Sequence, residues 1–247
     1  RARGPRGGAV TTDQHPRRLY LDLLKRGLLN TLYDDPDQLV MTPSGRHVPA
    51  AQVWERGGRA WLTPAHTMIG RKRLENIQFC LERVLAEEIP GDVIETGVWR
   101  GGATIFMRGI LKAYAVTDRF VWVADSFEGL PPPDAANFPA DADLDLSDIT
   151  ELAVPLETVR DNFARYGLLD DQVRFLKGYF KDTLPAAPIE NLALLRLDGD
   201  LYESTMQSLT YLYPKVSPGG FVIVDDFNAI EPCRRAVLDY LAAHDIS

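Results

Sequence analysis

From residue 93 onwards, short apolar runs alternate with segments of helical periodicity, and this alternation most constrains the fold. The strand-like runs occur at 93–95, 120–124, 173–176, 192–197 and 220–224. The helical segments lie at about 101–113, 156–166, 204–213 and 232–244. Strands that alternate with helices form parallel sheets through right-handed crossovers. The sequence therefore predicts an α/β fold: a doubly wound, mostly parallel sheet with helices on both faces.

The segment before residue 91 has a different organisation. Leucines at helical spacing predict an amphipathic helix over 17–33, and a second helix is expected over about 67–87. The residues between these helices are rich in proline and glycine and are expected to form loops. We expect three units, which are a disordered tail at 1–16, an N-terminal helical lid segment at 17–90 and a ligand-binding core at 91–247.

Composition and charge exclude several classes of partner. The 247 residues carry a net charge of −8, whereas binding to a nucleic-acid backbone needs a basic face. No apolar run reaches the roughly 18 residues that a membrane-spanning helix needs. Cys80 and Cys233 have no metal-ligand spacing and are expected to be reduced core thiols. We expect a cytoplasmic enzyme with a small-molecule substrate and with neither a nucleic-acid nor a membrane partner.

Acidic residues follow the last two strand-like runs directly. Asp198 and Asp200 come after one run, and Asp225 and Asp226 after the next. Ligands bind outside the carboxyl ends of strands in open parallel sheets, so these carboxylates should converge on one crevice. Crowded carboxylates repel one another unless a cation compensates, and hard divalent cations prefer oxygen ligands. We predict a metal site made by Asp198, Asp225 and Asp226; the alternative is ordinary solvated turns.

A glycine-containing turn follows the first strand-like run, from Glu95 through Gly97 to Gly101 and Gly102. Glycines let a backbone approach a ligand closely, and the N-terminus of the following helix favours negative charge. The spacing differs from the G-x-G-x-x-G dinucleotide fingerprint. An acidic residue here suits a ligand that bears an ammonium group, which indicates a nucleoside-type cofactor. The alternative is plain turn geometry.

A second acidic turn follows one βαβ step later. Asp125 ends the next strand-like run and is followed by Ser126. An acidic residue at this position can accept hydrogen bonds from ribose hydroxyls. The alternative is that Asp125 or Ser126 only caps a turn. The segment 131–155 that follows is an acidic insertion containing prolines.

With these motifs in view, the chain resembles the class I S-adenosylmethionine-dependent methyltransferases, and more narrowly the macrocin O-methyltransferase family. The matching segments are 19–25, 66–70, 95–102, 109–114, 122–127, 166–175, 198–200 and 217–221 with 225–226. That family methylates deoxysugar hydroxyls of macrolide and aminocoumarin antibiotics. The resemblance implies a metal-dependent O-methyltransferase that moves a methyl group from S-adenosylmethionine to a deoxysugar on a macrolide-type or related natural product.

The resemblance also implies roles for individual residues. It implies that the cofactor is held by Thr67, Met68, Glu95, Gly97, Gly101, Asp125 and Ser126. It implies that Mg²⁺ is bound by Asp198, Asp225 and Asp226, and that Asp200 or Asp198 takes the hydroxyl proton. His66 either touches substrate or is a structural histidine. Because related enzymes assemble into oligomers, a homo-oligomer is expected.

The predicted chemistry needs both a metal and a base. A divalent cation lowers the pKa of a hydroxyl and orients it, and a carboxylate then removes the proton. Two neighbouring hydroxyls can chelate the ion, so a vicinal diol is the expected acceptor, and a catechol or polyketide hydroxyl would suit the same chemistry. An NAD-dependent oxidoreductase would need a turn that this chain lacks. A non-catalytic binding module would not need the aspartates.

Overall fold

The computed structural model describes residues 16–32, 39–41, 47–49 and 65–246. Within them, five strands form one sheet in the order β5-β4-β3-β6-β7, with every neighbouring pair parallel. The strands are β3 (Asp92–Thr96), β4 (Val121–Asp125), β5 (Val173–Lys177), β6 (Leu192–Leu197) and β7 (Val216–Val224). This confirms the predicted doubly wound α/β fold.

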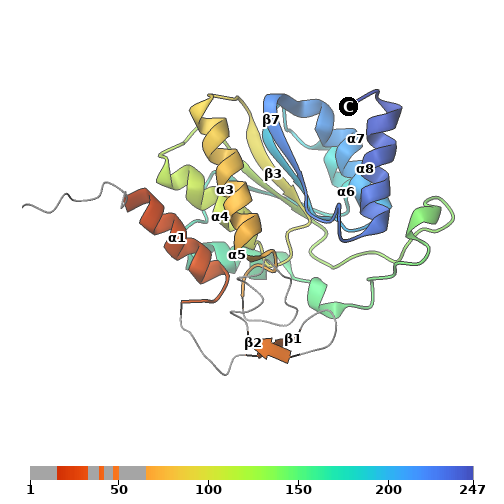
Figure 1. Cartoon of the computed structure of the whole chain (residues 1–247), viewed down its shortest axis with the longest axis horizontal. Coiled ribbons are helices and arrows are strands. Elements are labelled where there is room, and N and C mark those ends of the chain that lie inside the picture. Colours follow the sequence, from red (N-terminus) through yellow and green to blue (C-terminus); the bar gives the residue numbers. More distant parts are fainter. Residues whose placement is uncertain (1–15, 33–38, 42–46, 50–64, 247) are drawn as a thin grey trace, which may run out of the picture.

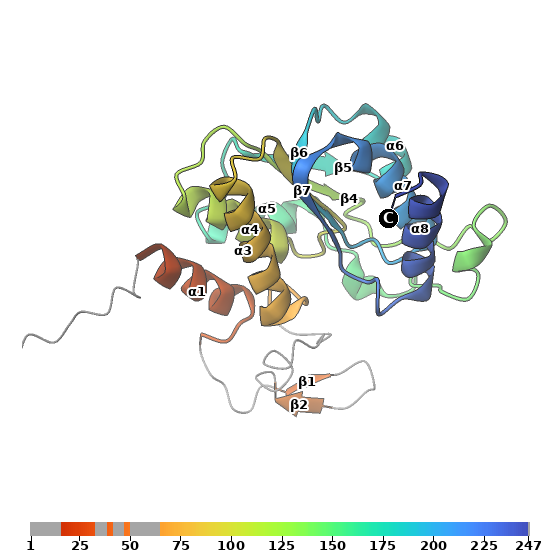
Figure 2. The ribbon, with the colours of Figure 1, turned by 45° about the horizontal axis from the view of Figure 1, so that its top comes forward.

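Helices cover both faces of the sheet (Figures 1 and 2). On one face lie α1 (Pro16–Leu28), α3 (Gly70–Ala86), α4 (Gly102–Ala113) and α5 (Leu156–Arg165). On the other lie α6 (Phe180–Thr183), α7 (Tyr202–Leu212) and α8 (Glu231–Ala243). Each face has its own apolar core, in which α1 and α3 pack on α4 and α7 packs on α8. The N-terminal helices therefore share a core with the sheet.

Strand β6, which lies between β3 and β7, is buried at all six positions, as expected for a strand covered on both faces. Five of its residues are Leu or Ala, and the sixth is Arg196, which is 0% exposed. A buried guanidinium needs charged or polar partners to offset its lost hydration. The partners of Arg196 lie at the carboxyl ends of the strands and define the site described below.

The N-terminal segment differs from the prediction in two places that matter for the site. Helix α1 ends at Leu28 instead of extending to residue 33, because Asn30 adopts a left-handed conformation (φ 55°) that ends a helix. Helix α3 begins at Gly70, so Thr67 and Met68 precede it in irregular structure. The segment predicted as loops also contains a short antiparallel pair, β1 (Leu39–Met41) and β2 (His47–Pro49).

Three further expectations concern the N-terminal tail, membrane-spanning helices and the acidic insertion. Residues 1–15 of the tail predicted to be disordered lie outside the described residues. Among the described residues, no helix is both long and apolar enough to cross a bilayer. The segment 131–155 contributes two short 3₁₀ turns, Pro139–Asp141 and Thr150–Leu152.

The chain reverses direction across the sheet between β3 and β6, so the loops after these two strands diverge and leave a crevice. The bases of the two loops are nevertheless in close backbone contact at Gly97, which has φ 88°. A Cβ atom added there would lie 2.0 Å from the carbonyl oxygen of Asp198. Glycine is therefore required at this position both for its conformation and for the close approach of two backbones.

Replacing Gly97 by alanine should lower the free energy of unfolding by more than about 2 kcal/mol, because left-handed strain and the overlap with Asp198 act together. The matched control is Gly27→Ala on α1, where the added Cβ would lie 3.4 Å from Tyr166 and the helix would gain a better former. Urea unfolding of both variants checks this. Equal stability of the two variants would contradict the account.

Candidate active site

A cavity of about 270 Å³ opens at the carboxyl ends of the strands. Loops that follow β3, β4, β5, β6 and β7 all contribute to it. The predicted site residues that line it are Thr67, Met68, Glu95, Gly97, Asp125, Ser126, Asp198, Asp200 and Asp225. Gly101 and Asp226 are not among its lining residues. Gly101 instead starts α4 in a left-handed conformation. The structure thus brings most of the predicted residues into one cavity.

Asp125 both shapes the turns and faces the cavity. Its carboxylate accepts hydrogen bonds from the backbone N–H groups of Val98 and Phe127, each at 2.7 Å. Burial raises the pKa of Asp125, and these backbone donors oppose the shift. The Ser126 hydroxyl donates to the carbonyl of Gly129 at 2.7 Å. The two interpretations of this motif, a cap and a ligand contact, are therefore compatible.

The segment before α3 is held against the start of α4. A Cβ added at Gly102 would lie 2.3 Å from the His66 carbonyl oxygen, so the two segments are in close backbone contact. The His66 ring forms a 2.8 Å hydrogen bond with the Tyr166 hydroxyl. His66 is not among the residues that line the cavity, whereas Thr67 and Met68 beside it are.

The aspartates after β6 and β7 converge as predicted. One carboxylate oxygen each from Asp198, Asp225 and Asp226 lie within 4.8 Å of one another. Asp226 is almost fully buried, at 1% exposed. Asp200 lines the cavity two residues after Asp198 and has φ 61°. A non-glycine residue in this conformation carries strain that neighbouring contacts must offset.

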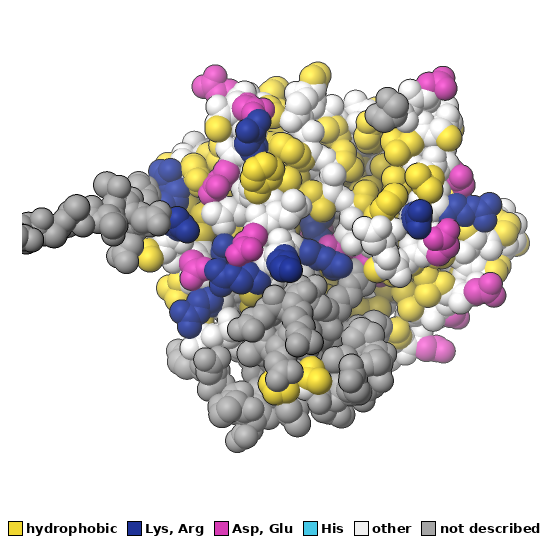
Figure 3. Space-filling view, in the orientation of Figure 1, with side chains coloured by type: hydrophobic (Ala, Val, Ile, Leu, Met, Phe, Trp, Pro, Cys, Tyr) yellow, Lys and Arg dark blue, Asp and Glu magenta, His cyan; other side chains and the backbone are white. Residues whose placement is uncertain are grey.

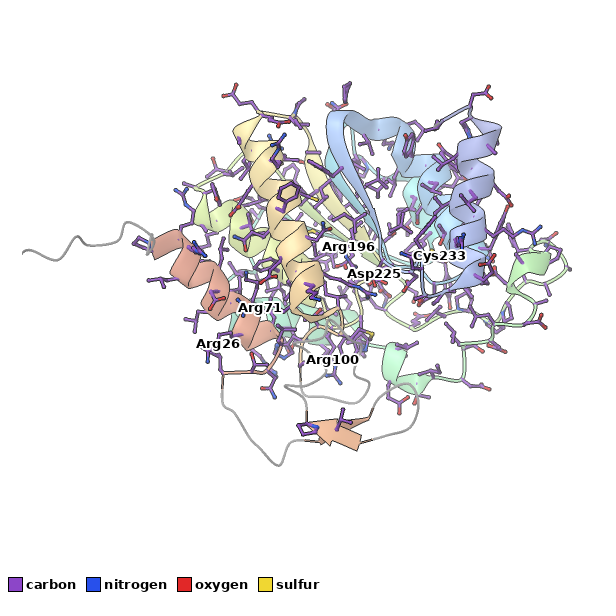
Figure 4. All side chains as sticks on the ribbon, viewed as in Figure 1. Arg26, Arg71, Arg100, Arg196, Asp225 and Cys233 are labelled. Carbon is purple, nitrogen blue, oxygen red and sulfur yellow. The ribbon has the colours of Figure 1, made fainter. Side chains whose placement is uncertain are left out.

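The cation at the centre of this cluster was not predicted from the sequence. The Arg196 guanidinium is buried beneath the aspartates and forms an ion pair with Glu95. It also donates to Asp198 at 2.7 Å and to Asp225 at 2.5 Å. Figure 4 shows Arg196 and Asp225 close together between the two helical layers. Burial alone would lower the pKa of Arg196, but Asp198, Asp225 and Glu95 raise it well above its usual value.

A second arginine reaches the cluster from the N-terminal segment. Arg73 on α3 donates to Asp225 at 2.7 Å, so the two oxygens of Asp225 accept from two arginines. Lys and Arg side chains gather over the lower parts of α1 and α3 in Figure 3. The sequence did contain a signal for Arg196, because a charged residue stands out inside an apolar strand two positions before Asp198. Helical periodicity gave no comparable signal for Arg73.

The structure also adds cavity residues that the motifs did not identify. They come mainly from the turn after β3, the segment 129–155 and the turn after β5. Among them are Trp99, Leu130, Pro131, Pro132, Leu152, Tyr179, Phe180 and Lys181. Tyr179, Phe180 and Lys181 could have been predicted from their position after β5, because the carboxyl ends of all parallel strands face the same crevice.

Glu95 has the most strongly shifted carboxyl group of the site. Burial raises its pKa to about 8, and Arg196 opposes that shift while Asp198 and Asp225 add to it. Unfolded Glu95 would titrate near 4.5. Between these values the folded state binds more protons than the unfolded state, so stability falls as the pH rises.

Glu95→Gln should remove this dependence, because glutamine imitates the protonated carboxyl. The free energy of unfolding of the wild type, measured relative to Glu95→Gln, should fall between pH 5 and about 8 and then level off. The slope should be at most about 1.4 kcal/mol per pH unit. Denaturant titrations at several pH values measure it. A difference that does not change with pH would contradict the shifted pKa.

Comparisons with known proteins agree with this geometry. The family described as Macrocin-O-methyltransferase (TylF) matches residues 17–247. A tetracenomycin-C 4'-O-methyltransferase of Streptomyces olivaceus that acts on a dimethoxy-rhamnosyl form is 55% identical over 94% of this chain and 87% of its own length. Mycinamicin III 3''-O-methyltransferase of Micromonospora griseorubida is also 55% identical, over 93% of this chain and 90% of its own.

Solved structures lead to the same assignment. The O-methyltransferase NovP is 54% identical, with a TM-score of 0.85 over 94% of this chain and 93% of NovP. The calicheamicin methyltransferase CalS11 is 17% identical with a TM-score of 0.57, over 98% of this chain and 90% of CalS11, and it supports the fold alone. The chain therefore belongs to the macrocin O-methyltransferase family and is an S-adenosylmethionine-dependent O-methyltransferase.

Proposed function

We propose that the protein moves a methyl group from S-adenosylmethionine to a hydroxyl of a deoxysugar on a macrolide-type or related natural product, with Mg²⁺ at the acidic cluster. The observation that carries the proposal is that carboxylates from β6 and β7 converge beside the cofactor turn of β3 in one cavity. The relatives at 55% identity are named for methylation of sugar-bearing antibiotics, which supports this acceptor class.

The cavity suits the cofactor on chemical grounds. Glu95 lies at the cavity wall near the end of β3, and Gly97 in the following turn also lines the cavity. The carboxylate of Asp125 accepts from backbone donors and still has lone pairs for ribose hydroxyls. We assign cofactor binding to these residues together with Thr67 and Ser126, and to Met68 and Gly101 as their neighbours. S-adenosylmethionine supplies an electrophilic methyl group on its sulfonium.

The acidic cluster suits Mg²⁺, which prefers carboxylate oxygens. Asp198, Asp225 and Asp226 present oxygens within 4.8 Å of one another, and Arg196 and Arg73 fix the two aspartates that they contact. When bound, a divalent cation lowers the pKa of an acceptor hydroxyl. Asp200 or Asp198 then takes the hydroxyl proton, and the cavity walls hold the acceptor in line with the methyl group.

The same chemistry on a catechol or polyketide hydroxyl is the alternative. A vicinal diol of either kind would suit the cluster, so the two acceptor classes differ in whether the methylated hydroxyl belongs to a sugar. A panel of glycosylated natural products and their aglycones separates the two, because the proposal expects methylation of glycosylated acceptors only. Methylation of aglycones at an equal rate would favour the alternative.

We also propose a homo-oligomer. Of the leucines on α1, Leu24 and Leu28 are buried within this chain, whereas Leu19 and Leu23 are each 54% exposed. An exposed leucine pair on one helix face suits contact with a second copy.

Removal of the metal tests the proposed mechanism. Full chelation with EDTA should lower methyl transfer by at least about 100-fold, because a bound cation supplies several kcal/mol of transition-state stabilisation. Added Mg²⁺ should restore the rate.

Asp225→Asn with Asp226→Asn should lose Mg²⁺ binding in calorimetry, and Asp145→Asn on the exposed insertion serves as the control. Full activity in EDTA, or in the double variant, would exclude the metal role.

A further inference from the structure

Asp141 is a buried carboxylate that the chemistry described above does not use. It ends the 3₁₀ turn Pro139–Asp141 in the segment 129–155, and it is 1% exposed. A buried carboxylate costs folding free energy unless hydrogen bonds compensate it. The donors that compensate Asp141 come from another part of the chain.

Those donors are at the first turn of α7. The two oxygens of Asp141 accept from the backbone N–H groups of Tyr202 at 2.7 Å and Glu203 at 3.0 Å. The first N–H groups of a helix have no partner within the helix, and Leu201, the residue at the cap position, offers no side-chain cap. A residue 61 positions before Tyr202 in the chain therefore supplies the cap of α7.

The capped turn directly follows residues 198–201 after β6, which carry the proposed base and are called the catalytic loop here. Asp200 has a left-handed φ of 61° and is separated from Tyr202 by one residue. The Ser204 hydroxyl donates to the Gly199 carbonyl at 2.5 Å and helps to hold the same loop. Such a strained conformation persists only where surrounding contacts determine it. Asp141 provides two contacts to the helical turn that begins two residues after Asp200.

The other part of the insertion is tied to the cofactor turn. The Trp99 indole N–H donates to the carbonyl of Glu151 at 2.8 Å. Residues of the insertion, including Pro131 and Leu152, line the same cavity as Asp200. The insertion therefore connects the cofactor turn after β3 with the catalytic loop after β6.

We propose that Asp141 is a positioning residue for methyl transfer, which fixes the start of α7 and through it the carboxylate of Asp200 relative to the acceptor. This inference rests on the proposed function only for the role of Asp200. The tie between the insertion and α7 is independent of that role and can be measured without any acceptor.

The test compares Asp141→Ala and Asp141→Asn with the matched control Asp145→Ala, which removes an exposed carboxylate of the same insertion. The kcat is expressed per site that binds S-adenosylhomocysteine in calorimetry, so a smaller fraction of folded protein does not lower the reported kcat. Asp141→Ala should lower this kcat by up to about 100-fold while cofactor affinity stays within about twofold, because a displacement near 1 Å at the reacting groups has that effect. Asp141→Asn keeps one acceptor oxygen and should restore part of the rate. Asp145→Ala should match the wild type.

Hydrogen exchange of the wild type and of Asp141→Ala gives the second readout. Amides in 198–205 should exchange faster in the variant, with no change in 93–101. If the wild type methylates its acceptor and Asp141→Ala has an unchanged kcat per binding site, the positioning role is overturned while the proposed function stands. Unchanged exchange in 198–205 would overturn the tie itself. A wild type that methylates no deoxysugar acceptor would contradict the proposed function, and the exchange data would still decide whether Asp141 holds the loop.

Discussion

The site depends on one buried guanidinium. Arg196 lies near the end of β6, fully removed from solvent, and contacts carboxylates from three different strand ends, Glu95, Asp198 and Asp225. Without a cation, Asp198 and Asp225 could not remain ionised so close together, whereas burial keeps Glu95 beside them protonated up to about pH 8. A guanidinium is suited to this position because it stays charged when buried and its planar donors can reach several carboxylates at once. The arginine thereby joins the proposed cofactor site to the proposed metal site.

The remaining elements hold the loops around this centre. Close backbone contact at Gly97 sets the distance between the turn after β3 and the loop after β6. The contact of Arg73 with Asp225 ties α3 to the end of β7, so the N-terminal segment is part of the site. Asp141 ties the acidic insertion to the start of α7. The loops after β3, β6 and β7 are therefore each fixed by a contact from a distant part of the sequence.

The parts that sequence could predict are those set by local pattern. Alternating strand and helix periodicity led to the correct sheet, and acidic residues after β6 and β7 predicted the cluster that the structure shows. Contacts between distant segments left little local signal. Nothing near Asp141 indicates that it caps α7, and a helical arginine such as Arg73 looks like any solvated residue. The limit of α1 was also misjudged, because leucine spacing continues past Asn30 while its backbone conformation ends the helix.

The most direct test of the central claim is a double-mutant cycle on the free energy of unfolding for Arg196→Met and Asp198→Asn at pH 7.5, where Glu95 with its pKa of about 8 is mainly protonated. Arg196→Met alone should cost about 3–5 kcal/mol, because it leaves buried carboxylates without a cation. Adding Asp198→Asn should recover part of that loss, with a coupling energy of at least about 1 kcal/mol, since one uncompensated carboxylate is removed. Additive losses in the double variant would contradict the claim that Arg196 compensates the carboxylate of Asp198.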